Sequence, residues 1–325
     1  MSNSDIFSES FLIPSDTDGI RLHLLHKHRK GEQKFSEAST IVMMHGATYS
    51  SGSLFDTPLE GASFADALAR AGFDVYAVDV RGYGGSTRPV EMLQAATLNA
   101  PAVRTDVAVR DFSSAVNFVL RTNGLSQVNV IGMSWGGSVT GTYTTQNGHK
   151  VRRLGLIAPQ WVSDKPLPLD PGGELNAWRI VNAGAARERW ISGAPQCKRG
   201  GLIPEGGFEA WLEKTVSDEP DDALRAQQSI RASNGPIQDI RDYWAAGKPF
   251  YDPADIGVPL MLIHGEWDID VPVELAQAWF LRATGSPDKR WLEIGEATHM
   301  MVLEKNRYQI YNALISFFRE PLAKA

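Results

Sequence analysis

The sequence is poor in cysteine, because its 325 residues contain only Cys197. An intramolecular disulfide is therefore impossible, and we expect a free thiol in a reducing compartment. The first residues, MSNSDIFSES, lack the basic start and the apolar stretch of a secretory signal. No apolar run reaches the length of about 18 residues that a membrane-spanning helix needs. Together these absences predict a cytoplasmic protein that does not cross a membrane.

Positive charge is scarce relative to negative charge. Lys and Arg number 32 against 38 Asp and Glu, so the net charge is −6. This balance argues against nucleic acid or an anionic membrane surface as a partner. The apolar fraction of 43% and the charged fraction of 22% are ordinary for a globular protein and exclude a disordered chain. We therefore expect a small-molecule substrate as the partner, and the sequence gives no signal for an oligomeric state.

Short apolar runs alternate with helical patterns along most of the chain. The first two runs flank a turn-forming segment and predict a hairpin. Short apolar strands that alternate with helices imply a mostly parallel sheet covered on both faces. The predicted strands are residues 10–13, 20–25, 40–44, 73–80, 128–131, 154–157, 258–263 and 290–294.

The alternation stops between residues 159 and 254. This stretch holds five of the nine tryptophans and shows no clean strand pattern. The strand–helix rhythm returns after Pro253. We therefore predict an α/β core built from residues 1–158 and 255–325, with residues 159–254 inserted as a mainly helical cap over one end of the sheet.

A G-x-S-x-G motif, residues 132–136, lies between a predicted strand and a predicted helix. A serine hydroxyl is a weak nucleophile, and it must project from the backbone toward a base. A sharp strand-to-helix turn achieves this, and Gly132 and Gly136 let the strand and helix pass closely. The helix that follows directs its first amides at developing negative charge. The motif predicts Ser134 as a catalytic nucleophile.

Two further residues follow in the chain order serine, acid, histidine that accompanies this motif. Asp268 lies just past the strand at 258–263, and His299 lies in the loop after the strand at 290–294. Catalytic groups of open α/β sheets gather beyond the carboxyl ends of strands, so the three residues can converge. Asp270 competes with Asp268 as the acid, and we favour Asp268.

Several motifs in order resemble the α/β-hydrolase superfamily, in particular serine hydrolases of the carboxylesterase and lactonase type with an inserted cap. The resemblance covers about residues 10–158 and 255–320. It rests on the G-x-S-x-G motif and on four other segments, which are residues 45–47 (His-Gly-Ala), 79–86, 264–272 and Thr298-His299 with Glu304 in the next helix.

The resemblance implies a role for each site residue and no cofactor or metal. Ser134 would attack an acyl carbon, His299 would relay its proton, and Asp268 would orient His299. The backbone N–H groups of Ala47 and Trp135 would bind the oxyanion. A small, largely apolar substrate would lie among side chains that include those of Trp135, Trp161 and Met300.

Other polar residues are interpreted as structural. His26 and His28 would share a strand face, but no Cys or carboxylate accompanies them at ligand spacing, so we predict no metal site. His45 is expected to hydrogen-bond within its own loop. Asp79 and Arg81 are expected to pair with each other and brace the loop near the motif.

The sequence leaves several functions open. Hydrolysis of an ester or lactone through an acyl-enzyme is the leading hypothesis. Residues 132–137, Gly-Met-Ser-Trp-Gly-Gly, also resemble prolyl aminopeptidases, although residues 45–49 depart from that group's His-Gly-Gly-Pro-Gly. Hydrolysis of carbon–carbon bonds uses the same three residues. A receptor that binds a ligand without turnover is the alternative of another class.

Overall fold

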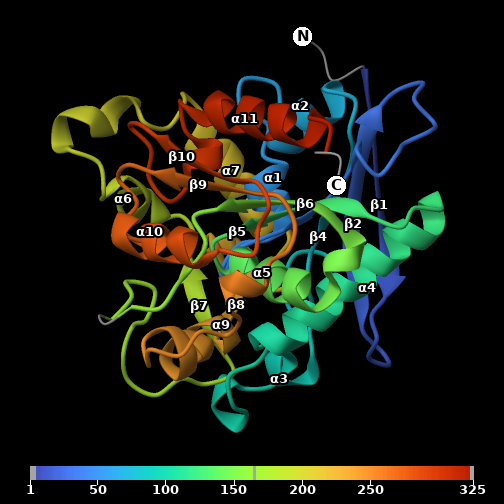
Figure 1. Cartoon of the computed structure of the whole chain (residues 1–325). Helices are drawn as coiled ribbons and strands as arrows, with labels where there is room; N and C mark the ends of the chain where they lie inside the picture. The colour runs from blue at the N-terminus through green and yellow to red at the C-terminus, as the bar shows by residue number, and fades with distance from the viewer. Residues whose placement is uncertain (1–4, 164–165, 323–325) are drawn as a thin grey trace.

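The centre of the protein is an eight-stranded sheet in the order β1-β2-β4-β3-β5-β6-β9-β10 (Figure 1). A computed structural model describes residues 5–163 and 166–322. The strands from β4 to β10 run parallel, and β1 and β2 add an antiparallel hairpin at one edge. The strands are β1 Ile6–Pro14, β2 Arg21–Arg29, β3 Thr40–Met44, β4 Asp74–Val78, β5 Val128–Met133, β6 Val151–Ile157, β9 Leu260–Gly265 and β10 Lys289–Ile294.

Helices cover both faces of this sheet, and its central strands β3, β4 and β5 are therefore buried at every position. In β3, Ile41 and Met43 join one buried cluster with α2 and α11, whereas Val42 and Met44 join the other with α4, α5 and α10. Figure 1 shows α2 and α11 together on one side of the sheet. The core helices are α1 Ser51–Phe55, α2 Phe64–Arg70, α3 Val90–Leu93, α4 Thr105–Asn123, α5 Trp135–Asn147, α10 Val273–Arg282 and α11 Arg307–Arg319.

The predicted fold class is confirmed, since each predicted strand and its alternation with helices is present in a mostly parallel sheet. Glu304 was predicted to lie in the last helix. It lies instead between the 3₁₀ turn Met301–Leu303 and the start of α11. No helix in the described part of the chain is both long and apolar enough to cross a bilayer.

Residues 159–254, called the cap segment below, connect β6 to β9. Besides its helices this segment contains two strands that no clean pattern in the sequence indicated, since β7 and β8 form a separate antiparallel pair. These strands are short and only partly buried in β7, so they lack the apolar runs of the main sheet. The elements are β7 Trp178–Asn182, α6 Ala186–Ile191, α7 Gly207–Ser217, α8 Asp222–Ala226, β8 Ser229–Ser233, α9 Gly235–Asp239 and a π-helical turn at Ile240–Trp244.

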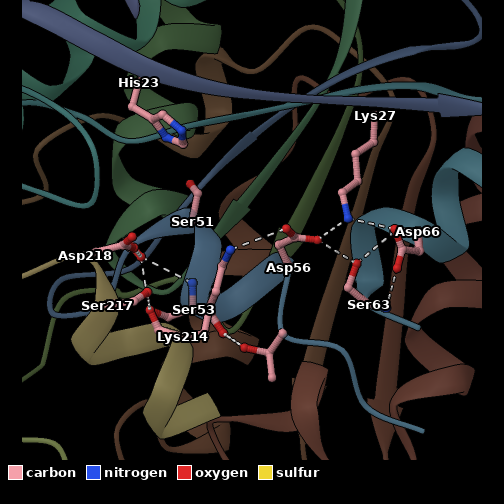
Figure 2. A network of polar contacts seen from close by, with 12 residues as sticks. His23, Lys27, Ser51, Ser53, Asp56, Ser63, Asp66, Lys214, Ser217 and Asp218 are labelled. Carbon is pink, nitrogen blue, oxygen red and sulfur yellow. Dashed lines mark hydrogen bonds and ion pairs between the residues drawn. The ribbon is translucent and has the colours of Figure 1, made fainter. Parts of the chain in front are cut away.

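A polar junction joins the cap segment to the core beside β2 (Figure 2). Lys27, buried on β2, donates to Asp66 at 2.8 Å and also contacts Asp56. The other carboxylate oxygen of Asp56 lies 3.7 Å from the Lys214 ammonium on α7. Asp218, just past α7, accepts a 2.8 Å hydrogen bond from the Ser50 hydroxyl. The junction therefore fixes α7 against α1.

Gly136, the second residue of α5, marks the closest approach of that helix to β3. A Cβ there would lie 2.4 Å from the carbonyl oxygen of His45 and 2.5 Å from that of Met44. Because backbone cannot move as a flexible side chain does, Gly136→Ala is expected to lower the free energy of unfolding by about 3 kcal/mol. Urea denaturation measures this change.

Gly148→Ala is the matched control, since Gly148 has helical dihedrals at the end of α5 and nothing lies within 4 Å of its added Cβ. It is expected to raise the free energy of unfolding by about 0.5 kcal/mol. Equal effects of the two substitutions would contradict the tight packing of α5 on β3.

Candidate active site

Ser134 lies at a strained turn between β5 and α5. Its φ of 57° and ψ of −123° put it outside the regions that side chains favour. The turn is tight because a Cβ on Gly132 would lie 2.4 Å from the carbonyl oxygen of Gly136. Such strain in a non-glycine residue is characteristic of functional sites. The predicted strand–turn–helix arrangement around Ser134 is present.

The loop after β3 is held rigidly beside this turn. His45 is fully buried, its Nδ1 lies 2.7 Å from the carbonyl oxygen of Gly46, and its Nε2 accepts from the N–H of Val80. Burial lowers the pKa of His45, which keeps the ring neutral in this arrangement. Tyr83 donates its hydroxyl to the carbonyl oxygen of Ala47 at 2.8 Å. The expected hydrogen bond of His45 within its loop is present.

Asp268 and His299 form a direct pair at the carboxyl ends of β9 and β10. His299 Nδ1 lies 2.7 Å from Asp268 Oδ2, and the Asp268 side chain is fully buried. The other oxygen of Asp268 accepts from the backbone N–H groups of Asp270 and Val271, both at 2.9 Å. These bonds orient the carboxylate, which in turn fixes the tilt of the imidazole.

Asp270 occupies a different position from Asp268. Its carboxylate binds both guanidinium nitrogens of Arg189 on α6, one of them at 3.0 Å. Burial alone would lower the pKa of His299, but the charges of Asp268 and Asp270 outweigh it and raise the pKa to about 9. Asp270 therefore acts electrostatically on His299, whereas Asp268 holds it by a hydrogen bond.

A second contact joins α6 to the loop that carries His299. The Glu304 carboxylate accepts from the indole N–H of Trp190 on α6 at 2.8 Å. It also accepts from the backbone N–H of Thr298 at 2.8 Å and from the Thr298 hydroxyl. Glu304 is fully buried. The neighbouring residues Arg189 and Trp190 thus support the two loops that carry Asp268 and His299.

Ser134 and His299 line one cavity of about 100 Å³ between the sheet edge and the cap segment. Ala47 and Met300 also line it, so the structure brings these four predicted residues together. Apolar side chains from the core and the cap segment form much of the wall; they are Leu54, Met133, Leu167, Leu169, Trp190 and Trp211. A concave wall of this kind, mostly apolar with a few polar groups, is typical of small-molecule sites.

Two residues predicted for the pocket lie elsewhere. The side chain of Trp135 is fully buried and donates its indole N–H to Thr105 at 2.8 Å, so only its backbone faces the turn. Trp161 packs against Trp244 and Tyr251. Neither side chain lines the cavity. A buried indole needs a hydrogen-bond partner or close packing. Trp135 has the first and Trp161 has the second, both in the core.

In the described part of the chain, Asp79 and Arg81 bind other partners, so the expected pair was wrong. Arg81 binds Asp111 on α4 with a shortest distance of 2.6 Å. Asp79 accepts from the backbone N–H of Ser51 at 2.8 Å and lies 2.9 Å from His23 Nδ1. Both residues still brace the loop near Ser134, because each is buried and tied to a neighbouring element.

A possible set of metal ligands lies at the same site. Asp268, Asp270 and His299 are the set of three possible ligands found within 4.8 Å of one another in the ranges that the structure describes. Arg189 already neutralises Asp270, which weakens the case for a cation there. His26 does meet two carboxylates in space, Glu9 at 3.0 Å and Asp74 at 2.7 Å, which sequence spacing could not reveal.

Sequence reasoning missed four polar residues that line the cavity. Arg189 and Gln160 belong to the cap segment, and Thr48 and Tyr49 follow the loop of Ala47. The only signal for Thr48 and Tyr49 was their closeness to the predicted oxyanion loop. Nothing in the local pattern separates Arg189 or Gln160 from solvent-exposed residues of their type.

Comparisons with known proteins support the same family. The model of the alpha/beta hydrolase fold family matches residues 39–306. The chain is 28% identical over 158 residues to the poly(3-hydroxyalkanoate) polymerase subunit PhaC of Haloferax mediterranei. That match covers 49% of this chain and only 28% of that protein.

Solved structures share the fold at low sequence identity. The 2-hydroxy-6-oxo-6-phenylhexa-2,4-dienoate hydrolase of Rhodococcus sp. strain RHA1 is 15% identical with a TM-score of 0.63, covering 97% of this chain and 100% of that one. A thermophilic esterase of Thermogutta terrifontis is 15% identical with a TM-score of 0.57, covering 96% and 98%. These similarities show that the overall fold is shared.

Proposed function

The chain belongs to the alpha/beta hydrolase fold family, and from that premise we propose that it is a serine hydrolase that cleaves a carboxylic ester or lactone. The observation that carries the proposal is the 2.7 Å bond between His299 and Asp268 at the cavity that Ser134 lines. A histidine oriented by a buried carboxylate beside a strained serine is the arrangement that activates a hydroxyl.

The proposed reaction has two halves. Ser134 Oγ attacks the carbonyl carbon while His299 Nε2 accepts its proton, and the backbone N–H groups of Ala47 and Trp135 bind the oxyanion. His299 then gives the proton to the leaving alcohol, which departs and leaves an acyl-Ser134 ester. Water then attacks that ester while His299 accepts a proton from it. His299 returns this proton to Ser134 Oγ as the carboxylic acid leaves, which restores the free serine. Asp268 keeps the imidazole in the required tautomer throughout.

The cap segment, residues 159–254, is proposed as the part that selects the substrate. It supplies Gln160, Leu167, Leu169, Arg189, Trp190 and Trp211 to the cavity wall. The core residues around Ser134 serve the chemistry, so the acyl group of the substrate is selected mainly by the cap residues of the wall.

Two measurements on the intact chain test the proposal. A fluorophosphonate probe is expected to label Ser134 stoichiometrically, as read by peptide mass spectrometry, because it reacts with activated serines. Hydrolysis of p-nitrophenyl esters from acetate to palmitate is expected to peak at one chain length. Labelling without turnover of any ester would favour the aminopeptidase or carbon–carbon hydrolase alternatives. Neither labelling nor turnover in folded protein would favour a ligand-binding receptor.

A further inference from the structure

Gln160 is fixed beside the nucleophile turn by its neighbours in the chain. It follows β6, which lies next to β5 in the sheet. The N–H of Ala158 donates to the carbonyl oxygen of Ile263 at 2.8 Å, and Pro159 packs on the first turn of α5, where a Cβ on Gly137 would come within 2.8 Å of it. The backbone of Gln160 is therefore held where its side chain lines the cavity that Ser134 lines.

The amide of Gln160 is buried without a partner in the part of the chain that the structure describes. The residue is 4% exposed, and its Oε1 accepts no hydrogen bond from the described residues. Buried polar atoms are nearly always satisfied, because leaving one unpaired costs its full desolvation penalty. Because Gln160 lines the cavity, a molecule bound there is in a position to supply the partner.

Several other polar groups of the cavity wall already have partners in the protein, although the indole N–H of Trp211 has none in the described residues. Arg189 binds Asp270, and His299 binds Asp268. Thr48 accepts a hydrogen bond from the Arg179 guanidinium at 3.1 Å. Gln160 differs from them because an apolar side chain of similar size would fill its place at no cost to the protein's own hydrogen bonding. Its amide contributes to the cavity and not to the fold.

We propose that Gln160 determines specificity by binding a hydroxyl that the substrate carries close to its scissile carbonyl. The substrate class is a hydroxylated carboxylic ester whose remaining surface is apolar, as the Leu and Trp side chains of the wall require. A hydroxyl both donates and accepts, so it pairs with either end of an amide. This inference rests on the proposed function and adds the substrate feature that the apolar wall alone would not select.

The test compares matched pairs of esters that differ only by one hydroxyl. The acyl pairs are p-nitrophenyl butyrate against p-nitrophenyl 2-hydroxybutyrate and 3-hydroxybutyrate, and the alcohol pair is ethyl butyrate against 2-hydroxyethyl butyrate. In the wild type, kcat/KM for at least one hydroxylated ester is expected to exceed that of its partner about tenfold or more. Gln160→Leu is expected to reduce that ratio to within about twofold of one.

Stability and a second variant separate this role from a structural one. Gln160→Leu removes a buried unpaired oxygen, so its melting temperature is expected to stay level or rise; a clear fall would assign Gln160 to the fold and overturn the proposal. Gln146→Leu is the control, because Gln146 is exposed near the far end of α5, and it is expected to leave every ratio unchanged.

The outcomes distinguish the two proposals. If the wild type hydrolyses the esters but shows no hydroxyl preference in any pair, the role of Gln160 is wrong and the serine hydrolase stands. A preference that survives in Gln160→Leu also overturns the role of Gln160. If no ester of any pair is hydrolysed by folded protein, the proposed function itself fails.

Discussion

Replacing Ser134 with alanine is expected to lower kcat for the best p-nitrophenyl ester by about 10⁵-fold or more. The hydroxyl is the atom that forms the acyl-enzyme, and alanine leaves His299 with no proton to accept. The substitution removes one oxygen from a position that is 8% exposed, so the fold is expected to survive. Initial rates and circular dichroism measured together separate lost chemistry from lost structure.

Ser138→Ala provides the matched control for this prediction. Ser138 is one turn further along α5, is fully buried, and its hydroxyl has no partner in the described residues. Its loss is expected to change kcat by less than about twofold, as for a substitution away from the reacting atoms. An active Ser134→Ala variant, or an equal loss in both variants, would refute Ser134 as the nucleophile.

The second large effect is expected for Asp268→Asn, which should lower kcat about 10⁴-fold. An asparagine in the same orientation would present its Nδ2 donor to His299 Nδ1 and would lack the charge that stabilises the imidazolium. It would keep the acceptor for the N–H groups of Asp270 and Val271, so the loop is expected to hold its shape. The rate of hydrolysis at saturating ester measures the loss.

Asp270→Asn is the matched comparison, because the two carboxylates lie two residues apart and both raise the pKa of His299. Only neutral His299 accepts the serine proton, so kcat/KM should rise with pH through that pKa, above the ordinary value of 6.5. Removing one negative charge lowers the pKa, so Asp270→Asn should shift this limb to lower pH with a modest loss of rate. A 10⁴-fold loss in Asp270→Asn alone would make Asp270 the acid.

The elements around Ser134 could be predicted from the sequence because their signals are local. A run of apolar residues, two glycines at fixed spacing and a helix that follows them specify the turn at Ser134 without reference to distant contacts. The same holds for Asp268 and His299, which follow recognisable strands. Parallel strands place their carboxyl ends at one edge, so the convergence of the three residues followed from topology.

The cap segment resisted prediction because its structure depends on partners far along the chain. Arg189 meets Asp270, 81 residues away, and Trp190 meets Glu304, 114 residues away. The tryptophans of this segment look alike in sequence, yet Trp161 packs in the core while Trp190 and Trp211 face the cavity. Tertiary packing determines where each tryptophan lies, and the local sequence pattern does not indicate that packing.

The two adjacent contacts of α6 restrict which cap segments the core of this protein could accept. A cap grafted from a relative would have to bring a cation for Asp270 and an N–H donor for Glu304, or two loops of the recipient would lose their support. An unpaired Asp270 would then hold less firmly to its negative charge, and the working pH range would change with it. A replacement cap segment would therefore need residues equivalent to two neighbouring side chains, Arg189 and Trp190.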